Sequence, residues 1–407
     1  MGLYRYAPKP SGRMGLLWTL GGIPNTAILE FGSMGHMLYA ERWLFQSAPF
    51  RGGKLYTTHL DEKDIALGIT KRFFLAVEEI IKKEAPSVIF VLPSTVPAVT
   101  GVDMEDLCFE AEETYGQKII MLKRGSFHEK LHHGIEEGLF CLVNEFARKA
   151  KIQKTEGITC NLIGSCIDLA KYHSDVQELK RIVKEAFDME TICVLTSETS
   201  IEQVKNMGGA HINLVLRKEG VKAAEVLKDA FGTDYVYGRP YGYEGTVAWL
   251  KEIGEKLSLV PDKTFIEKEC FEGEYTFLYC KQMTASFGQN ASISIGGNYD
   301  VVKGIINFAT KEVGLKKKYV WCDVKEYEDE DIPYQAEDDL IKHMTKELTG
   351  ILMADRTAFE MAKREEGLII NRSLNNRVFN PYDTPYVGFR GALNLCALWI
   401  EELMGKR

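Results

Sequence analysis

Short apolar, β-branched runs alternate along this chain with longer segments in which apolar residues recur every three to four positions. The first pattern is typical of buried strands and the second of amphipathic helices. Because strands that alternate with helices build βαβ units, we predict an α/β protein with parallel sheets. The chain has 407 residues, more than a single hydrophobic core usually serves, so two or three domains are expected.

The predicted elements form three units, at residues 1–150, 151–270 and 271–407. The expected strands are Thr26–Glu30, Ser87–Leu92 and Lys118–Leu122, then Thr159–Ile163, Thr191–Leu195, Ala210–Leu216 and Asp234–Tyr237, then Ser292–Ile295, Lys318–Trp321, Gly350–Met353 and Gly367–Ile370. The expected helices include Ile65–Lys83, Asp103–Tyr115, Asp175–Ala186, Lys222–Ala230, Asp300–Val313 and Ala392–Met404. The polar stretch Arg148–Glu156 is the expected first linker, and the four strands after it indicate a flavodoxin-like or Rossmann-like domain.

Composition narrows the class of protein. The chain is 45% hydrophobic and 27% charged, as soluble globular proteins are. Its formal net charge of -8 disfavours nucleic acid as a partner. No long uncharged apolar stretch predicts a membrane span, and the N-terminal residues lack an apolar signal core. A cytoplasmic protein is therefore expected.

The cysteines indicate buried free thiols. There are nine, an odd number, without a C-x-x-C pair, and several lie inside apolar runs, as Cys193 does. Cys108 is expected to pack on a helix face, and Cys270 and Cys280 to flank the start of a strand. Cys166 follows a predicted strand, where a thiol is either structural or an acidified, reactive group.

Six segments, taken in order, resemble one known family. They are Ser11–Leu16, Phe31-Gly32-Ser33-Met34-Gly35-His36, Glu62–Gly68, Ser87–Thr95 with Gly101-Val102-Asp103, Tyr241–Thr246, and Tyr386–Ala392. Their order and spacing resemble the nitrogenase component 1 type oxidoreductases, a family of nitrogenase iron-molybdenum protein subunits, cofactor scaffold proteins and light-independent protochlorophyllide reductase. The resemblance implies three Rossmann-like or flavodoxin-like domains with parallel sheets.

The resemblance also marks a cluster site whose cysteines are replaced. Family members carry cluster-binding cysteines at the positions of Ser11, His36 and Thr95, and the loops at Gly35 and Gly101 belong to the same site. Iron–sulfur clusters are normally held by thiolates, which none of these residues supplies. His36 is thus either a metal ligand or catalytic proton donor beside an interface iron–sulfur cluster completed by a partner's cysteines, or a helix N-terminal residue without a metal.

Arg217 stands where the resemblance places the cysteine that binds the nitrogenase iron-molybdenum cofactor, directly after the run Asn213–Leu216. A guanidinium does not ligate iron, so neither that cofactor nor nitrogen fixation is expected. Arg217 either binds an anionic ligand, such as a carboxylated tetrapyrrole, or is a surface arginine after a strand.

Two further motifs have weaker chemical meaning. His128, His132 and His133 lie close together, and the i, i+4 spacing of the first two suits either a divalent metal or a polar helix start. Gly296 and Gly297 open a helix whose backbone N–H groups suit a carboxylate or phosphate. The chain has neither a G-x-G-x-x-G nor a Walker signature, so neither NAD binding nor ATP hydrolysis by this chain is expected.

Together these features predict one subunit of a nitrogenase-like component 1 oxidoreductase. Low-potential electrons would come from an ATP-dependent iron-protein reductase and reduce a small-molecule substrate in the cleft between domains. The expected assembly is a homodimer or a heterotetramer with a cysteine-bearing homologue. Two alternatives remain: a non-catalytic scaffold or assembly homologue that has lost its cluster, and a tetrapyrrole or metal carrier.

Overall fold

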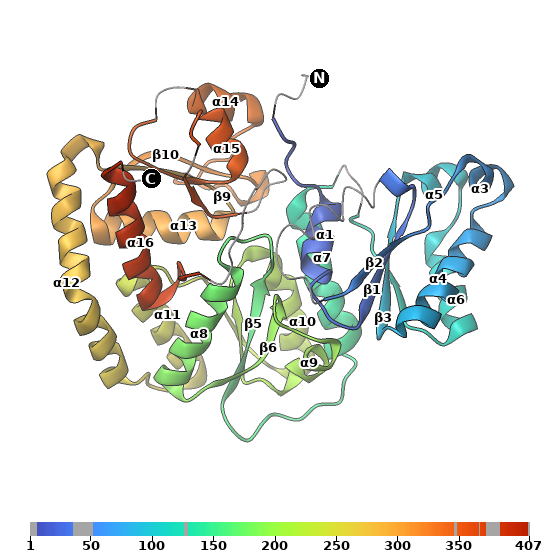
Figure 1. The fold of residues 1–407 in the computed structure, drawn as a ribbon. Helices are drawn as coiled ribbons and strands as arrows, with labels where there is room; N and C mark the ends of the chain where they lie inside the picture. The colour runs from blue at the N-terminus through green and yellow to red at the C-terminus, as the bar shows by residue number, and fades with distance from the viewer. Residues whose placement is uncertain are drawn as a thin grey trace.

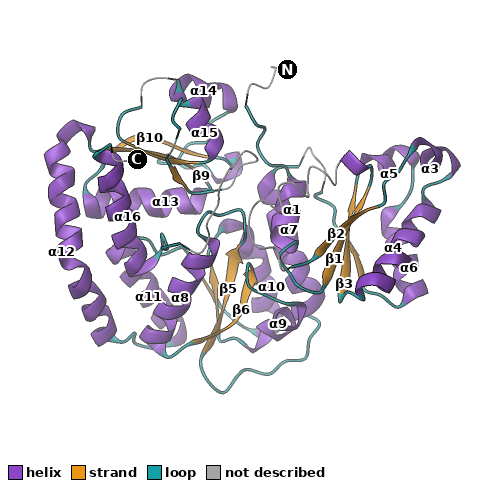
Figure 2. Cartoon of the chain, viewed as in Figure 1, coloured by secondary structure: helices purple, strands orange, loops and turns teal. Residues whose placement is uncertain are grey.

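The computed structural model describes residues 6–35, 52–125, 129–345, 348–365, 367–371 and 383–405. It contains three separate four-stranded sheets, each flanked by helices (Figures 1 and 2). All strand pairs within these sheets are parallel. The predicted α/β class with parallel sheets is therefore confirmed.

The N-terminal unit is built on the sheet β2-β1-β3-β4. Its strands are β1 Thr26–Phe31, β2 Lys54–Thr57, β3 Val88–Pro93 and β4 Ile119–Met121. Its helices are α1 Gly12–Leu20, α3 Glu62–Leu67, α4 Thr70–Glu84, α5 Thr95–Thr100, α6 Met104–Tyr115 and α7 Leu131–Leu142.

The central unit has the sheet β6-β5-β7-β8. Its strands are β5 Thr159–Ser165, β6 Glu190–Thr196, β7 Ile212–Val215 and β8 Tyr235–Tyr237. Its helices are α8 Tyr172–Phe187, α9 Ile201–Lys205, α10 Val221–Phe231 and α11 Gly242–Leu257.

The third unit has the sheet β10-β9-β11-β12. Its strands are β9 Ser292–Gly297, β10 Lys316–Cys322, β11 Ile351–Ala354 and β12 Leu368–Ile369. Its helices are α12 Lys263–Phe287, α13 Tyr299–Asn307, α14 Glu337–Met344, α15 Arg356–Met361 and α16 Gly388–Leu403.

The three sheets share one strand order, in which the second strand lies outside the first and the third and fourth follow on the other side. The order reverses between the first and third strands of each sheet. In open parallel sheets, ligands bind beyond the carboxyl ends of the strands at that reversal. The topology therefore points to β5 and β7 in the central unit and to β9 and β11 in the third.

Side-chain alternation explains why helices cover both faces of the first sheet. Val88, Phe90 and Leu92 of β3 pack into one apolar core, while Ile89 and Val91 pack into a second. Successive side chains of a strand point to opposite faces, so a fully apolar strand needs helices on both sides. This is why continuous apolar runs were a correct signal for these strands.

Two local predictions are wrong, and one strand was missed. The helix expected at Ile65–Lys83 is two helices, α3 and α4, separated at Gly68, whose φ of 105° no helix adopts. The strand β2 was not predicted, because it has four residues, lies at a sheet edge and is only half-buried. Cys270 and Cys280 do not flank a strand start; both lie in the long helix α12.

The strands β1–β4, β5–β8 and β9–β12 fall within residues 1–150, 151–270 and 271–407 respectively, and the domain boundaries themselves stay a prediction. The helix α12 runs across residue 270, at the outer edge of the molecule (Figure 1). In the part of the chain that the structure describes, no helix has the length and apolar character that crossing a membrane requires.

Candidate functional site

A cavity of about 270 Å³ lies where the three units meet. The third unit contributes four polar residues to its wall, each within two positions of a strand end. They are Asn298 after β9, Asp323 after β10, Asp355 after β11 and Asn371 after β12. The cavity is thus at the carboxyl edge of this sheet, where the strand order predicts a ligand.

The central unit contributes a buried charged group from the same edge of its own sheet. Arg217, two residues after β7, donates from Nη1 to both carboxylate oxygens of Asp168 at 2.9 Å. Its Nε donates to Glu219 at 2.9 Å. Each of the three side chains is at most 3% exposed. One cation is thus enclosed by two carboxylates, which leaves the cluster with a formal excess of one negative charge.

The backbone of β5 is shaped to admit this arginine. Gly164 has a φ of 96°, a conformation that L side chains rarely adopt. A Cβ placed there would lie 2.6 Å from Cγ of Arg217. Glycine is therefore required at this position both for the backbone conformation and for the space that the Arg217 side chain fills.

The alternative that Arg217 is a surface arginine is wrong, because the residue is 1% exposed. Burial raises the pKa of Asp168 above its usual range despite the neighbouring guanidinium. Burial alone would lower the pKa of Arg217, but Asp168 and Glu219 raise it well above its ordinary value. The arginine is a permanent cation whose charge is already paired, so its binding of an anionic ligand stays a prediction.

The N-terminal unit closes the cavity with the first residues of α1 and α7. Ser11, directly before α1, and His132, in the first turn of α7, both line it. The two helices run in the same direction, since Gly12 lies against Gly134 and Thr19 against Gly138. They pack very closely, because a Cβ on Gly134 would overlap the carbonyl oxygen of Gly12. This parallel crossing brings both helix starts to the cavity.

The imidazole of His132 is buried between two aromatic rings. Its ring centroid lies 4.1 Å from that of His133 and 5.4 Å from that of Tyr327. Burial lowers the pKa of His132, so the neutral imidazole is favoured near neutral pH. His128 lies outside the described residues, and α7 begins at Leu131, so the helical spacing expected between His128 and His132 has no support.

Two carboxylates from the third sheet share the cavity wall. Asp323 accepts a hydrogen bond from Nζ of Lys9 at 2.8 Å. Asp355 accepts the backbone N–H of Ala358 at 2.9 Å and thereby caps α15. Burial first, and the nearby Asp323 second, raise the pKa of Asp355 to about 6. Asp355 is therefore suited to hold and release a proton close to neutral pH.

The glycine pair before α13 has a packing role. A Cβ on Gly296 would overlap the ring of Trp321, and one on Gly297 would overlap Oδ1 of Asn371. That Oδ1 accepts the backbone N–H of Asn298 at 3.3 Å. The asparagine thus occupies a backbone donor that was expected to bind a carboxylate or phosphate.

The remaining predicted site residues are spread along the N-terminal unit. Thr95 is the first residue of α5, and Gly101 caps the other end of that helix with a φ of 71°. Gly35 is exposed near the end of the described range 6–35, and His36 lies outside the described residues. Among the predicted site residues that the structure describes, Ser11, His132 and Arg217 line the cavity.

The thiols do not fit a thiolate-held cluster in this cavity. All nine cysteines lie among the described residues and eight are buried, and none belongs to the cavity wall. Burial raises the pKa of Cys166 to about 11 and that of Cys193 to about 12. The alternative that Cys166 is an acidified, reactive thiol is therefore wrong. Cys108, on α6, packs into an apolar core as predicted.

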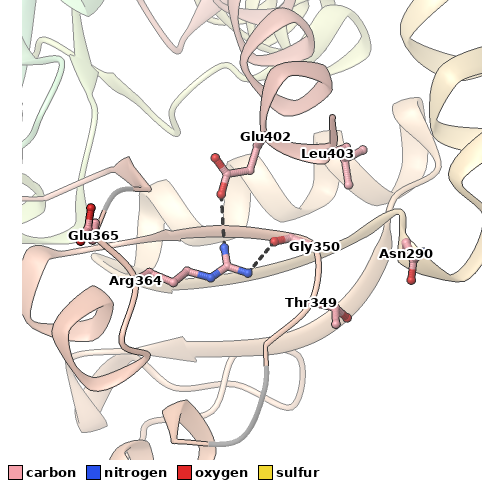
Figure 3. Close-up of a pocket in the computed structure, with 7 residues that line it drawn as sticks. All are labelled: Asn290, Thr349, Gly350, Arg364, Glu365, Glu402 and Leu403. Atoms are coloured by element: carbon pink, nitrogen blue, oxygen red, sulfur yellow. Dashed lines mark hydrogen bonds and ion pairs between the residues drawn. The ribbon is translucent and has the colours of Figure 1, made fainter. Parts of the chain in front are cut away.

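A second hollow, of about 610 Å³, lies at the opposite edge of the third sheet (Figure 3). There Arg364 pairs with Glu402 at 3.2 Å and donates to the carbonyl oxygen of Gly350 at 2.9 Å. This hollow borders the amino ends of β9 and β11, and its one arginine is already satisfied. We therefore assign the candidate site to the smaller cavity between the units.

Several residues of this site were missed in the sequence. Asp168, Glu219, Asp323 and Asp355 all lie one to four residues beyond a predicted or observed strand end. A position just beyond a strand end was the signal that could have identified these residues, because the carboxyl ends of parallel strands converge on one edge of a sheet. The sequence position of a residue does not indicate which strand ends of different sheets face one another.

Comparisons with known proteins identify the family of the chain. Residues 11–404 match the family described as Nitrogenase component 1 type Oxidoreductase. The nitrogenase iron-molybdenum cofactor biosynthesis protein NifE of Clostridium pasteurianum is 25% identical over 353 residues, 84% of this chain and 73% of that protein. One of the subunits of the light-independent protochlorophyllide reductase of Heliobacterium modesticaldum is 24% identical over 269 residues, 65% of this chain and 50% of that relative.

A solved structure described as nitrogenase Cp1 at pH 6.5 superposes with a TM-score of 0.79 at 18% identity. The superposition covers the whole of this chain and 94% of that one, and at this identity it concerns the fold alone. The family match extends over nearly the entire chain and includes all three sheets and the helices α1 and α7. The chain belongs to the nitrogenase component 1 type oxidoreductase family.

Proposed function

We propose that this chain is a cytoplasmic subunit of a nitrogenase-like oxidoreductase that binds a small polar substrate in the cavity between its three units. The observation that carries the proposal is the convergence of buried charged and titratable groups at the carboxyl edges of two sheets. Fixed charges in a site shielded from water orient a polar molecule at low reorganisation cost. The chemistry is reduction of that molecule, and not nitrogen fixation.

The chain's own contribution is binding and proton supply. Asp355, whose pKa is raised to about 6, gives up a proton just below neutral pH, and the neutral imidazole of His132 relays or accepts one. Arg217 with its two carboxylates forms a rigid wall that resists rearrangement when the substrate's charge changes. His36 stays a second proposed proton donor or metal ligand.

The electrons come from outside the described cavity. Low-potential electrons are delivered by an ATP-dependent iron-protein reductase, and any iron–sulfur cluster is completed by the cysteines of a second subunit. This assignment is supported by the family match together with the lack of thiols in the cavity wall of the described chain. The proposed assembly is a heterotetramer with a cysteine-bearing homologue, or a homodimer.

The lack of thiols in the cavity wall of the described chain also supports a second candidate function. A scaffold or assembly homologue keeps the fold and the pairing surface and needs no cluster. The similarity to NifE, whose name assigns it to cofactor biosynthesis, is compatible with that role.

One experiment separates the two functions. The chain is purified anaerobically, alone and co-expressed with a homologous second subunit, and iron and acid-labile sulfide are measured per chain. The co-purified complex is then mixed with reduced iron-protein reductase and MgATP, and oxidation of the reductase is followed. Iron in the complex with ATP-dependent electron uptake supports the oxidoreductase. Loss of that iron in His36→Ala identifies His36 as a ligand.

Iron-free preparations that take up no electrons overturn the oxidoreductase and leave the scaffold. A complex that contains iron but takes up no electrons also overturns it, since a component 1 subunit must accept electrons from its reductase.

A further inference from the structure

Three metal-binding side chains meet at the start of α7, beside the cavity. They are His132, His133 and Glu326, and their candidate ligand atoms all lie within 4.8 Å of one another. The histidines belong to the N-terminal unit, and Glu326 belongs to the short turn Lys325–Tyr327 after β10 in the third unit. The group is therefore assembled by the tertiary fold, and it shares His132 with the cavity described above.

The distances are close to those that a metal ion imposes. Nε2 of His132 lies 3.9 Å from Oε2 of Glu326. Zinc binds such donors at about 2.0–2.2 Å in a tetrahedron, which places two donor atoms about 3.3 Å apart. The side chain of His132 is 7% exposed, whereas that of Glu326 is 51% exposed and has space to turn inward. A small rotation of the glutamate closes the gap.

Glu326 already presents one oxygen to the histidines. Its Oε1 accepts a hydrogen bond from Nζ of Lys130 at 2.8 Å, while Oε2 is the oxygen nearest His132. The lysine therefore orients the carboxylate without occupying the atom that faces the imidazole.

His133 is held in the way that metal-binding histidines usually are. Its Nδ1 lies 2.6 Å from Oε2 of Glu129, whose other oxygen accepts Nη1 of Arg124 at 3.0 Å. When Nδ1–H donates to this carboxylate, the lone pair is on Nε2. A carboxylate bound to the far nitrogen fixes the tautomer and ring orientation of a ligating histidine.

We propose that His132, His133 and Glu326 bind one divalent transition-metal ion, with Glu129 positioning the ring of His133. Two imidazoles and a carboxylate suit zinc, cobalt or ferrous iron, whereas magnesium and calcium prefer sites made of oxygen alone. Three protein ligands leave a coordination position open. Because His132 lines the cavity, a bound ion borders the candidate site.

The test uses the full chain, stripped of metal with a chelator and titrated with Co²⁺ in the absence of any reductase or substrate. We expect one equivalent to bind, with ligand-field absorption typical of nitrogen and oxygen donors, and one equivalent of Zn²⁺ to displace it. His133→Gln and Glu326→Gln should each weaken binding at least tenfold, and Glu129→Gln about 10–100-fold. Circular dichroism verifies that each variant is folded.

His173→Gln is the matched control, because Nδ1 of His173 also contacts a glutamate, Glu198, at 2.6 Å, while His173 belongs to no group of three metal-binding side chains among the described residues. This variant should bind Co²⁺ as the unaltered chain does. The proposal is overturned if less than a fifth of an equivalent binds, if Glu326→Gln and His133→Gln bind normally, or if thiolate-to-cobalt charge-transfer absorption places the ion on cysteine.

Discussion

At the scale of the residue, buried charges distinguish the site from the rest of the core. Arg217, Asp168 and Glu219 are paired almost without solvent contact. Burying charges costs several kcal/mol per ion, which is recovered when every donor and acceptor is well matched. Such a group adds little net stability, but removal of one member leaves the others buried and unpaired.

Arg217→Met should therefore destabilise the chain by about 3–5 kcal/mol, because two buried carboxylates lose their cation. Denaturant unfolding followed by circular dichroism measures the change. Arg148→Met is the control, since Arg148 is exposed and its side chain bonds only to Asn144 in the described structure, and its effect should stay within about 0.5 kcal/mol. Equal stability of the two variants would contradict the assigned pairing.

Asp355 predicts a pH dependence with a definite sign. Its pKa is raised from 3.8 to about 6 in the folded chain, where Asp323, Lys9 and the capped backbone of α15 face it. As pH rises from about 4 to 6, the unfolded chain loses this proton first, so the free energy of unfolding falls. The fall approaches about 3 kcal/mol and is complete above pH 6.

Asp355→Asn should remove this dependence, because an amide does not titrate and still caps α15. The variant should gain stability over the unaltered chain steadily from pH 4 to pH 6.5. Unfolding at half-unit intervals of pH measures the difference. Parallel stability profiles for the two chains would show that Asp355 ionises normally.

At the scale of the element, the crossing of α1 and α7 depends on small residues. A Cβ on Gly12, Gly15 or Gly134 would overlap or crowd the backbone of the other helix or the loop before it. Glycine costs helix stability, but here it allows two helix axes to approach closely. The close approach sets where Ser11 and His132 lie in the cavity wall.

Gly134→Ala should destabilise the chain by about 1–3 kcal/mol or more, since the added methyl group meets a carbonyl oxygen that is unable to move freely. Gly245→Ala on α11 is the control, because nothing lies within 4 Å of its added Cβ. That variant should be unchanged or up to about 1 kcal/mol more stable. Thermal unfolding of both variants measures the contrast, and a tolerated Gly134→Ala would mean that the helices pack more loosely.

At the scale of the whole molecule, the last described segment fastens the third unit to the central one. Oδ1 of Asp175 on α8 accepts the backbone N–H of Tyr386 at 2.7 Å and that of Val387 at 3.3 Å. Its other oxygen pairs with the buried Arg239. The helix α16 then packs against α8, α11 and α12, between the two units (Figure 1).

Asp175→Ala should loosen this attachment, because it leaves a buried arginine and two backbone donors without their acceptor. We expect faster amide hydrogen exchange in residues 383–405, measured by mass spectrometry on the folded chain. Peptides from α4, in the N-terminal unit, should exchange as before and act as the internal reference. Uniform acceleration in both regions would point to global destabilisation instead of local release.

The local pattern of the sequence was sufficient for the architecture. Strands such as Val88–Pro93 are continuous apolar runs between helical segments, and both features depend only on neighbouring residues. The same local evidence failed for the short edge strand Lys54–Thr57, where few apolar contacts leave little trace in the sequence. The order of the family's motifs identified the family for the same reason, because order and spacing are properties of the chain alone.

The composition of the site was decided by the tertiary structure. His132 and Glu326 are far apart in sequence and come together only because the fold places the start of α7 beside the turn after β10. The burial of Arg217 likewise depends on two carboxylates supplied by separate loops. A sequence pattern records which face of an element is apolar, whereas the grouping of polar side chains depends on how the three sheets are placed against one another.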